Sequence, residues 1–202
     1  IMSKPEAILI LAPLDPYFVN IYIHIIQQTR VLYPSSQVIV SPLWGLRFFR
    51  EYNLLRPRSV ALAGKQSFDY YTSQYTACSR LKSLFKSFNN LGGCSSVSFL
   101  RYSDWRRYRS LSSFSLQAEA LSLRESTQNY AIGDITVGDL LIDTFLRQRP
   151  SPQFFADDPF STTLVRLSWY YYSYYSAIID RYAIKALFTS YCSYIHNGIA
   201  SR

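Results

Sequence analysis

The stretch AILILAP at residues 7–13 decides the fold of this chain. Apolar residues follow one another from Ala7 to Ala12 without a polar interruption, and Pro13 ends the run. A short, continuous apolar run is typical of a strand that is buried on both faces of a parallel sheet. We therefore predict a strand over residues 7–12 that lies inside such a sheet.

Helical and strand patterns alternate after this first run. In order, residues 18–32 fit a helix, 37–42 a buried strand, 44–52 a short helix and 59–64 a third strand. Strands that alternate with helices through short connections indicate a parallel sheet with crossover helices. We therefore expect three adjacent parallel strands within residues 7–64, which is half of a Rossmann-like fold.

The rest of the chain adds a small hairpin and long helices rich in aromatic residues. Helical patterns cover residues 68–88, 104–125, 139–147 and 161–182, and residues 184–188 fit a fourth buried strand. Residues 129–137 fit a β-hairpin whose turn, Gly133-Asp134, suits type II′, because glycine tolerates the positive φ of the first turn position. The predicted fold class is α/β: one domain over residues 1–202, with helices on both faces of a Rossmann-like parallel sheet.

The composition favours a folded protein with an anionic partner. Of the 202 residues, 49% are hydrophobic and 17% aromatic, which argues against a disordered chain. The net charge of +8 favours nucleic acid, a nucleotide, a phosphorylated sugar or an acidic membrane face. Nucleic acid is not supported, because the chain has no RNP-like, helix-turn-helix or zinc-finger pattern.

The sequence predicts neither a membrane span nor a disulfide framework. The apolar run at residues 7–12 is too short to cross a bilayer or to form a signal segment with its cleavage site. Cys78, Cys94 and Cys192 lie far apart without a CxxC pair, which favours a reducing compartment. We expect a cytoplasmic protein, with peripheral contact at the anionic inner face of the plasma membrane as an alternative.

Acidic residues are scarce, yet three of them lie in the segment GDITVGDLLIDTFLR at residues 133–147. On a helix that begins at Asp139, the side chains of Asp139, Asp143 and Arg147 share one face, and apolar side chains occupy another. Two interpretations stay open. Asp139 can favour the helix N-terminus while Asp143 and Arg147 form an ordinary i,i+4 pair, or the three can hold a substrate.

The carboxyl ends of the predicted strands give further candidate residues. Ligands of open parallel sheets bind beyond these ends. The segment after the first strand contains Asp15, a candidate substrate-binding residue, and the segment at 189–197 contains His196, a candidate general base. The alternative for His196 is a helix residue that only forms hydrogen bonds. His24 lies among isoleucines, where at least partial burial is expected.

The common short motifs identify no reaction. The loop after the first strand, PLDPY, lacks the glycines of GxGxxG, which disfavours a dinucleotide cofactor there. The chain also has no GxSxG, P-loop, HExxH or EF-hand pattern. We therefore expect no cofactor and no metal site.

Two strings in the second half of the chain do resemble a known family. ITVGDLLIDTFLR at residues 135–147 and YCSYIHNGIASR at residues 191–202 resemble bacterial capsule and O-antigen polysaccharide biosynthesis proteins. These are glycosyltransferase-like proteins of the two-Rossmann-domain (GT-B) type. The positions that carry the resemblance are Gly138, Asp139, Asp143, Arg147, Tyr194, Gly198 and Arg202. The amino-terminal half is compatible with this family without being specific for it.

The resemblance implies metal-independent glycosyl transfer from a nucleotide sugar to a glycan or lipid-linked acceptor. This chain would be the acceptor-side domain, and a nucleotide-sugar domain would follow Arg202, so the isolated chain would lack the donor site. His196, chosen from its chemistry, and Asp139 are the candidate catalytic residues. The candidate substrate-binding residues are Asp15, Asp143, Arg147, Tyr194, Gly198 and Arg202.

Two other functions stay open. One is a non-catalytic scaffolding protein of polysaccharide assembly whose basic face contacts the membrane. The other is an unrelated α/β protein that binds phosphate-bearing ligands. The gene sequence downstream of the codon for Arg202 discriminates among the three: about 150 further residues of alternating strands and helices favour the transferase, and a stop codon favours the other two.

Overall fold

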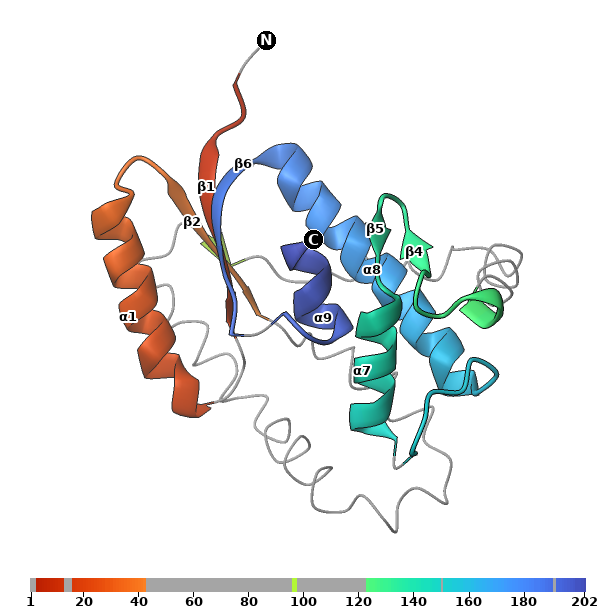
Figure 1. The fold of residues 1–202 in the computed structure, drawn as a ribbon. Coiled ribbons are helices and arrows are strands. Elements are labelled where there is room, and N and C mark those ends of the chain that lie inside the picture. The colour runs from red at the N-terminus through yellow and green to blue at the C-terminus, as the bar shows by residue number, and fades with distance from the viewer. Residues whose placement is uncertain (1–2, 13–15, 43–95, 98–122, 150, 191) are drawn as a thin grey trace. The chain divides into compact units, whose positions relative to one another are not determined.

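The computed structural model describes six parts of the chain, and these divide into two compact units (Figure 1). We call the first the sheet unit; it comprises residues 3–12, 16–42, 96–97 and 178–190. We call the second the hairpin unit; it comprises residues 123–149, 151–177 and 192–202. The helices predicted at 44–52 and 68–88 and the strand predicted at 59–64 lie outside the described residues, as does the predicted helix at 104–125 up to residue 122.

The sheet unit is built on a parallel sheet of four strands. They are β1 (Glu6–Ala12), β2 (Gln37–Pro42), β3 (Ser96–Val97) and β6 (Ala183–Phe188), in the order β3-β2-β1-β6. Ile8 pairs with Val38 and Ile10 with Val40 in parallel register, which confirms the predicted pairing of the first two runs. The side chains of β1 from Ala7 to Leu11 are at most 3% exposed, as expected for a strand buried on both faces.

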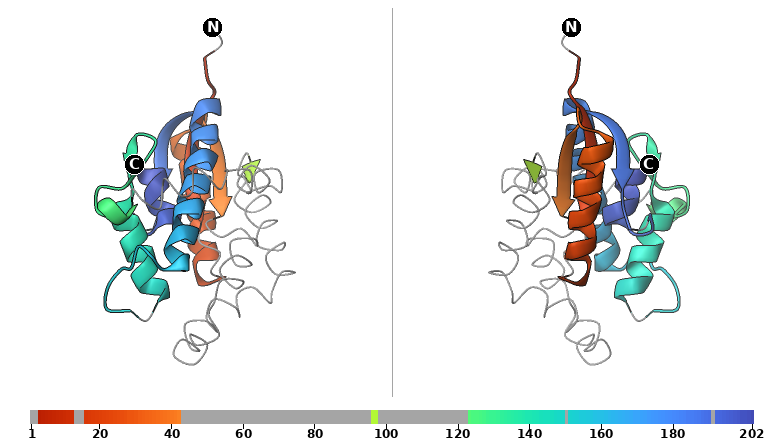
Figure 2. Two further views of the ribbon diagram at one scale, coloured as in Figure 1. Left: turned by 90° about the vertical axis from the view of Figure 1, so that its right-hand side faces the viewer. Right: turned by 90° about the vertical axis from the view of Figure 1, so that its left-hand side faces the viewer.

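Helix α1 (Pro16–Leu32) connects β1 to β2 and packs against them (Figure 2). Tyr22, Ile23 and Ile26 of α1 form a buried cluster with the isoleucines and valines of the two strands, Ile8, Ile10, Val38 and Val40. Burying a side chain such as Ile26 completely contributes about 1.5–3 kcal/mol. His24 is exposed, so the expectation of burial is wrong. At 100° per residue, His24 lies about 160° around the helix from both Tyr22 and Ile26, which is nearly the opposite side.

β6 confirms the fourth predicted strand but not its predicted burial. It pairs with β1 in parallel, from Ala183 beside Glu6 to Phe188 beside Ile10. Its side chains are half-buried or exposed, because β6 has a neighbouring strand on only one side in the described sheet. Lys185 of β6 forms an ion pair with Glu6 across this junction, with Nζ 2.9 Å from Oε1.

The hairpin unit contains the predicted hairpin. β4 (Ala131–Ile132) and β5 (Ile135–Thr136) pair antiparallel around Gly133, whose φ is 59°. Positive φ at the first turn position but not at Asp134 agrees with the type II′ turn. The turn lies against Tyr172, whose hydroxyl donates to Asp134 Oδ1 at 3.1 Å. The ring of Trp169 meets the Tyr172 ring edge-on, with the centroids 5.9 Å apart.

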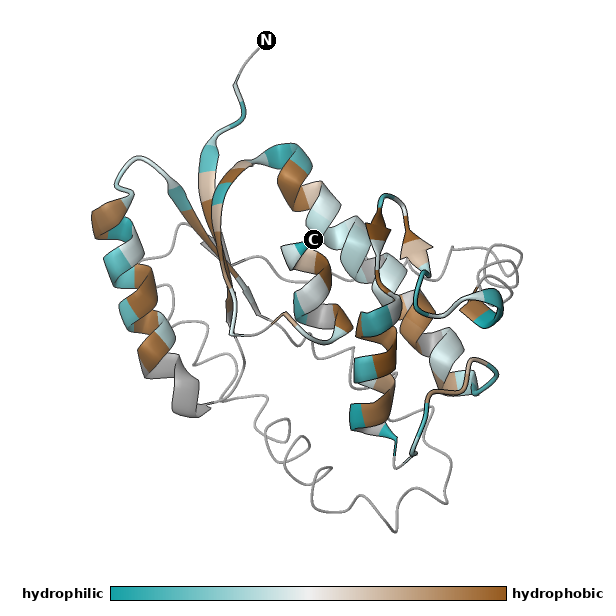
Figure 3. Cartoon of the chain, viewed as in Figure 1, coloured by the Kyte–Doolittle hydropathy of each residue, from teal (hydrophilic) through white to brown (hydrophobic). Residues whose placement is uncertain are grey.

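Two long helices follow the hairpin, as predicted. They are α7 (Gly138–Gln148) and α8 (Pro159–Arg181), and the hydrophilic and hydrophobic residues of α7 can be seen in Figure 3. Asp158 begins α8: its Oδ1 accepts the Phe160 amide at 2.7 Å, and Pro159 occupies the first helical position. The chain then passes through β6 to α9 (Ile195–Gly198) and the 3₁₀ turn η3 (Ile199–Ser201). No helix in the described part of the chain combines the length and apolarity needed to cross a bilayer.

The core of the hairpin unit follows the helical pattern of the sequence. Leu140, Leu141, Thr144 and Phe145 are buried on the inner side of α7, whereas Asp139, Asp143 and Arg147 are exposed on its outer side. Phe145 meets Phe154 edge-on at a centroid distance of 4.9 Å. This confirms the two faces predicted for residues 139–147.

Candidate functional site

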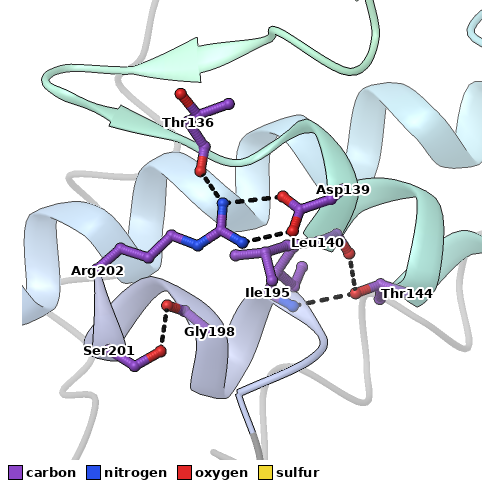
Figure 4. Close-up of polar contacts among 8 residues, drawn as sticks. All are labelled: Thr136, Asp139, Leu140, Thr144, Ile195, Gly198, Ser201 and Arg202. Atoms are coloured by element: carbon purple, nitrogen blue, oxygen red, sulfur yellow. Dashed lines mark hydrogen bonds and ion pairs between the residues drawn. The ribbon is translucent and has the colours of Figure 1, made fainter.

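The two strings that resemble the polysaccharide proteins contact each other within the hairpin unit (Figure 4). We call residues 136–147 and 192–202 the motif cluster. α7 supplies one side of it, and α9 with η3 supplies the other. The contacts are an ion pair, a buried hydrogen-bond bridge, close glycine packing and a cation–π pair.

The ion pair joins Asp139 to Arg202. Nη1 of Arg202 donates to Asp139 Oδ1 at 2.9 Å, and Nη2 donates to Oδ2. Nη1 also donates to the carbonyl of Thr136 at the end of β5 (Figure 4). The pair is bidentate, which fixes the orientation of both side chains. Both side chains are partly exposed, so the pair contributes only about 0.2–1 kcal/mol to stability.

This pairing determines the charge state of Asp139. The hydrogen bond from Arg202 holds the pKa of the Asp139 carboxyl below its ordinary value of 3.8, and the positive charge of Arg202 acts in the same direction against partial burial. Asp139 is therefore ionised at neutral pH, with Arg202 donating to both of its oxygens. A carboxylate of lowered pKa is a weak proton acceptor, so the geometry favours a positioning role for Asp139. Its predicted catalytic role stays a prediction.

A buried hydroxyl bridges α7 and α9. Thr144 Oγ1 donates to the Leu140 carbonyl at 2.7 Å and accepts the backbone N–H of Ile195 at 3.0 Å. Thr144 is 3% exposed and Ile195 is fully buried. The bridge satisfies an N–H at the start of α9 that would otherwise be buried without a partner. The sequence showed Thr144 on the apolar side of a helix but gave no sign of its acceptor role.

Two glycines allow close backbone approach in the cluster. A Cβ on Gly138 would meet the Thr127 carbonyl oxygen and lie 2.7 Å from the Gln128 carbonyl oxygen. A Cβ on Gly198 would meet the Leu140 side chain and lie 2.6 Å from the Cys192 carbonyl oxygen. A glycine at position 198 thus permits the packing of α9 on α7.

Arg147 lies over the ring of Tyr194, with the guanidinium carbon 5.4 Å from the ring centroid. The ion pairs among the described residues are Arg124–Asp157, Arg149–Asp158, Lys185–Glu6 and Arg202–Asp139. The i,i+4 pair of Asp143 with Arg147, one of the two interpretations left open by the sequence, is not among these ion pairs of the described residues. Arg147, on the outer face of α7, thus contacts Tyr194 in the segment that follows β6.

Tyr194 holds an unusual backbone conformation. Its φ is 64° and its ψ is 147°, and no other non-glycine residue in the described ranges has positive φ. Such a conformation costs about 1–3 kcal/mol. A cation–π pair at an exposed site contributes about 0.5–1 kcal/mol, which does not offset this cost over most of its range.

The other predicted site residues lie elsewhere or outside the described part. Asp15 is outside the described residues. His196 lies in α9, between Ile195 and Asn197, which are both fully buried. The structure therefore brings Asp139 together with Arg202 and Arg147 together with Tyr194, and it places His196 on the same short helix as Gly198.

In the sheet unit, a hydroxyl pair lies at the carboxyl end of β6. Tyr22 of α1 forms a side-chain hydrogen bond with Ser190, two residues beyond Phe188. Burial raises the pKa of the Tyr22 hydroxyl, and the hydrogen bond with Ser190 offsets part of that shift. This pair was not predicted from the sequence. Within the described residues, no three His, Cys, Asp or Glu side chains are grouped as metal ligands.

Removing the guanidinium in the variant Arg202→Gln should cost stability in a pH-dependent way. The pKa of Asp139 is lower in the folded state, so the contribution is present above the unfolded pKa, near 3.8, and is lost as the pH falls through the lower folded pKa. At neutral pH we expect the free energy of unfolding of Arg202→Gln to be about 0.2–1 kcal/mol lower than that of the wild type. Urea denaturation of both proteins across the acid range measures it, and a difference that persists unchanged in acid would contradict the pairing.

Close packing and an ion pair within the motif cluster explain why several residues of the two strings have the types they have. Gly138 and Gly198 permit close approach, and Asp139 and Arg202 close the ends of the cluster. These contacts join the hairpin, α7 and α9 into one unit. No family model, no curated protein and no solved structure matches the chain.

Proposed function

We propose that this chain is the acceptor-side, Rossmann-like part of a glycosyltransferase of bacterial surface polysaccharide biosynthesis. The observation that carries the proposal is the Asp139–Arg202 contact, which joins the two resembling strings within one unit. Strings that are far apart in a sequence and serve one function are expected to lie together. The donor is a nucleotide sugar, the acceptor a glycan or lipid-linked sugar, and the site of action the cytoplasm.

The sheet topology supports a ligand site at the carboxyl ends of the strands. β1 is followed by α1 and β2 on one side, and β6 lies on its other side, so the strand order reverses at β1. In open α/β sheets, ligands bind at such a reversal. Tyr22 and Ser190 supply hydroxyls at that edge, and the net charge of +8 favours a phosphate-bearing ligand.

His196 is the proposed general base, which would take the proton of the acceptor hydroxyl during transfer. Asp139 is proposed to act through Arg202, by holding the segment that carries His196 against α7. Asp139 is thus a positioning residue in this proposal.

A second candidate function is a non-catalytic protein that binds phosphate-bearing ligands. It is favoured by the pairing of Asp139 with Arg202, because groups that satisfy each other stabilise a fold whether or not a reaction takes place. Binding of the nucleotide sugar or of the acceptor without transfer would identify this function.

The test uses the natural full-length protein with a panel of UDP-, GDP- and CMP-sugars and a bacterial membrane extract. Nucleotide release and incorporation of labelled sugar into the lipid fraction are measured together with the melting temperature. His196→Ala should lower transfer and keep the melting temperature, whereas His24→Ala, a histidine exposed on α1, should change neither. Full transfer by His196→Ala would show that the base is another residue.

A further inference from the structure

Tyr194 occupies a position where a glycine would be less strained. The chain does place a glycine at its other positive φ within the described residues, at Gly133. At Tyr194 the backbone is fixed on its carboxyl side, because Ile195 N–H donates to Thr144 Oγ1 and Gly198 N–H donates to the Tyr194 carbonyl at 2.8 Å. These hydrogen bonds therefore hold Tyr194 at positive φ, although this conformation is unfavourable for a residue with a side chain.

A second arginine–tyrosine pair shows that such a contact needs no strain. Arg181 lies 5.3 Å from the ring centroid of Tyr182, and Tyr182 has no positive φ. A contact between an arginine and a tyrosine ring therefore does not by itself require a positive φ. Strained residues held by their surroundings gather at ligand-binding positions.

The chemistry around Tyr194 indicates what it would bind. The ring is half-buried, and Arg147 is exposed above it on the outer face of α7, one turn after the exposed Asp143. A guanidinium is planar, and its N–H donors fit a phosphate in a bidentate manner. A tyrosine ring offers an apolar face for the C–H groups of a sugar, and a carboxylate accepts hydrogen bonds from sugar hydroxyls.

We propose that Tyr194 and Arg147 form a platform that binds a sugar phosphate, with the sugar on the ring and the phosphate on the guanidinium. This rests on the proposed function, whose donor and lipid-linked acceptor both carry a phosphate beside a sugar.

The test measures binding of glucose 1-phosphate, inorganic phosphate and glucose to the full chain by isothermal titration calorimetry. The variants are Tyr194→Gly, Tyr194→Phe and Arg147→Gln, with Tyr182→Gly as the matched control. We expect glucose 1-phosphate to bind the wild type more tightly than phosphate does. Tyr194→Gly and Arg147→Gln should each weaken it at least about tenfold, a typical consequence of losing one charge-assisted or stacking contact.

The stability readout separates binding from folding. Tyr194→Gly relieves the backbone, so its melting temperature should equal or exceed that of the wild type while binding is lost, and Tyr194→Phe should keep binding. Tyr182→Gly should leave binding unchanged. Unchanged binding by Tyr194→Gly, a lowered melting temperature, or no binding of any probe by the wild type would overturn the platform. Sugar transfer by the full-length Tyr194→Gly protein at an unchanged KM would reject the platform and leave the proposed function standing.

Discussion

Gly138→Ala should destabilise the protein by about 3 kcal/mol, although alanine is normally the better helix residue. In an unhindered helix, replacing glycine with alanine stabilises by about 0.5–1 kcal/mol. Here the new Cβ would meet the backbone carbonyl oxygens of Thr127 and Gln128, which cannot rotate away as a side chain does. Overpacking of this kind typically costs about 1–3 kcal/mol, and backbone neighbours put the cost at the upper end.

The sign of the change decides between these two effects, and urea denaturation measures it. Gln128→Ala is the matched control, because the Gln128 side chain is exposed and its replacement leaves the carbonyl in place. It should change the free energy of unfolding by less than about 0.5 kcal/mol. A Gly138→Ala protein as stable as the wild type would mean that residues 127–128 do not approach the start of α7 in solution.

Thr144→Val should cost about 1–3 kcal/mol at nearly constant side-chain volume. The valine keeps the apolar contacts but removes the acceptor of the Ile195 N–H, which stays buried. An unsatisfied buried donor carries this penalty because its hydrogen bond to water is lost without replacement. Amide hydrogen exchange at Ile195 should accelerate in the variant, and the free energy of unfolding should fall.

Thr29→Val provides the control for Thr144→Val. Thr29 is 2% exposed and donates to the Ile25 carbonyl at 2.7 Å, so the same substitution removes the same donor in a buried helix position. The difference between the two variants therefore isolates the amide of Ile195. Equal costs for both variants would show that the bridge to α9 contributes nothing beyond an ordinary helix hydrogen bond.

The hydrophobic pattern was sufficient to predict strands and turns that depend only on a few consecutive residues. The run at residues 7–12 pairs in parallel with that at 37–42, and the hairpin turns at Gly133 as its φ requires. Burial was harder to predict, because it depends on neighbours. β6 has the apolar composition of an inner strand but is half-buried at the edge of the described sheet, and His24 lies on the outer side of α1.

The contacts of the motif cluster could not be predicted because they join residues far apart in the chain. Nothing in the sequence near Asp139 indicates that its partner is Arg202 rather than a residue one helical turn away. The same holds for Thr144, whose neighbours predict an apolar face while its hydroxyl serves a distant amide. Helical spacing left an Asp143–Arg147 pair open as one interpretation, whereas the guanidinium of Arg147 lies over Tyr194.

The contact between the hairpin turn and α8 gives the protein an optical probe of its own. The Tyr172 ring contacts the ring of Trp169, and its hydroxyl donates to Asp134 in the turn. Tyr172 therefore connects the indole of Trp169 to the hairpin. Replacing Trp44 and Trp105 with phenylalanine would leave Trp169 as the single tryptophan, which can be excited selectively over the tyrosines. Its fluorescence would then report detachment of the hairpin from α8 in real time, and circular dichroism of the same sample would report the helices separately.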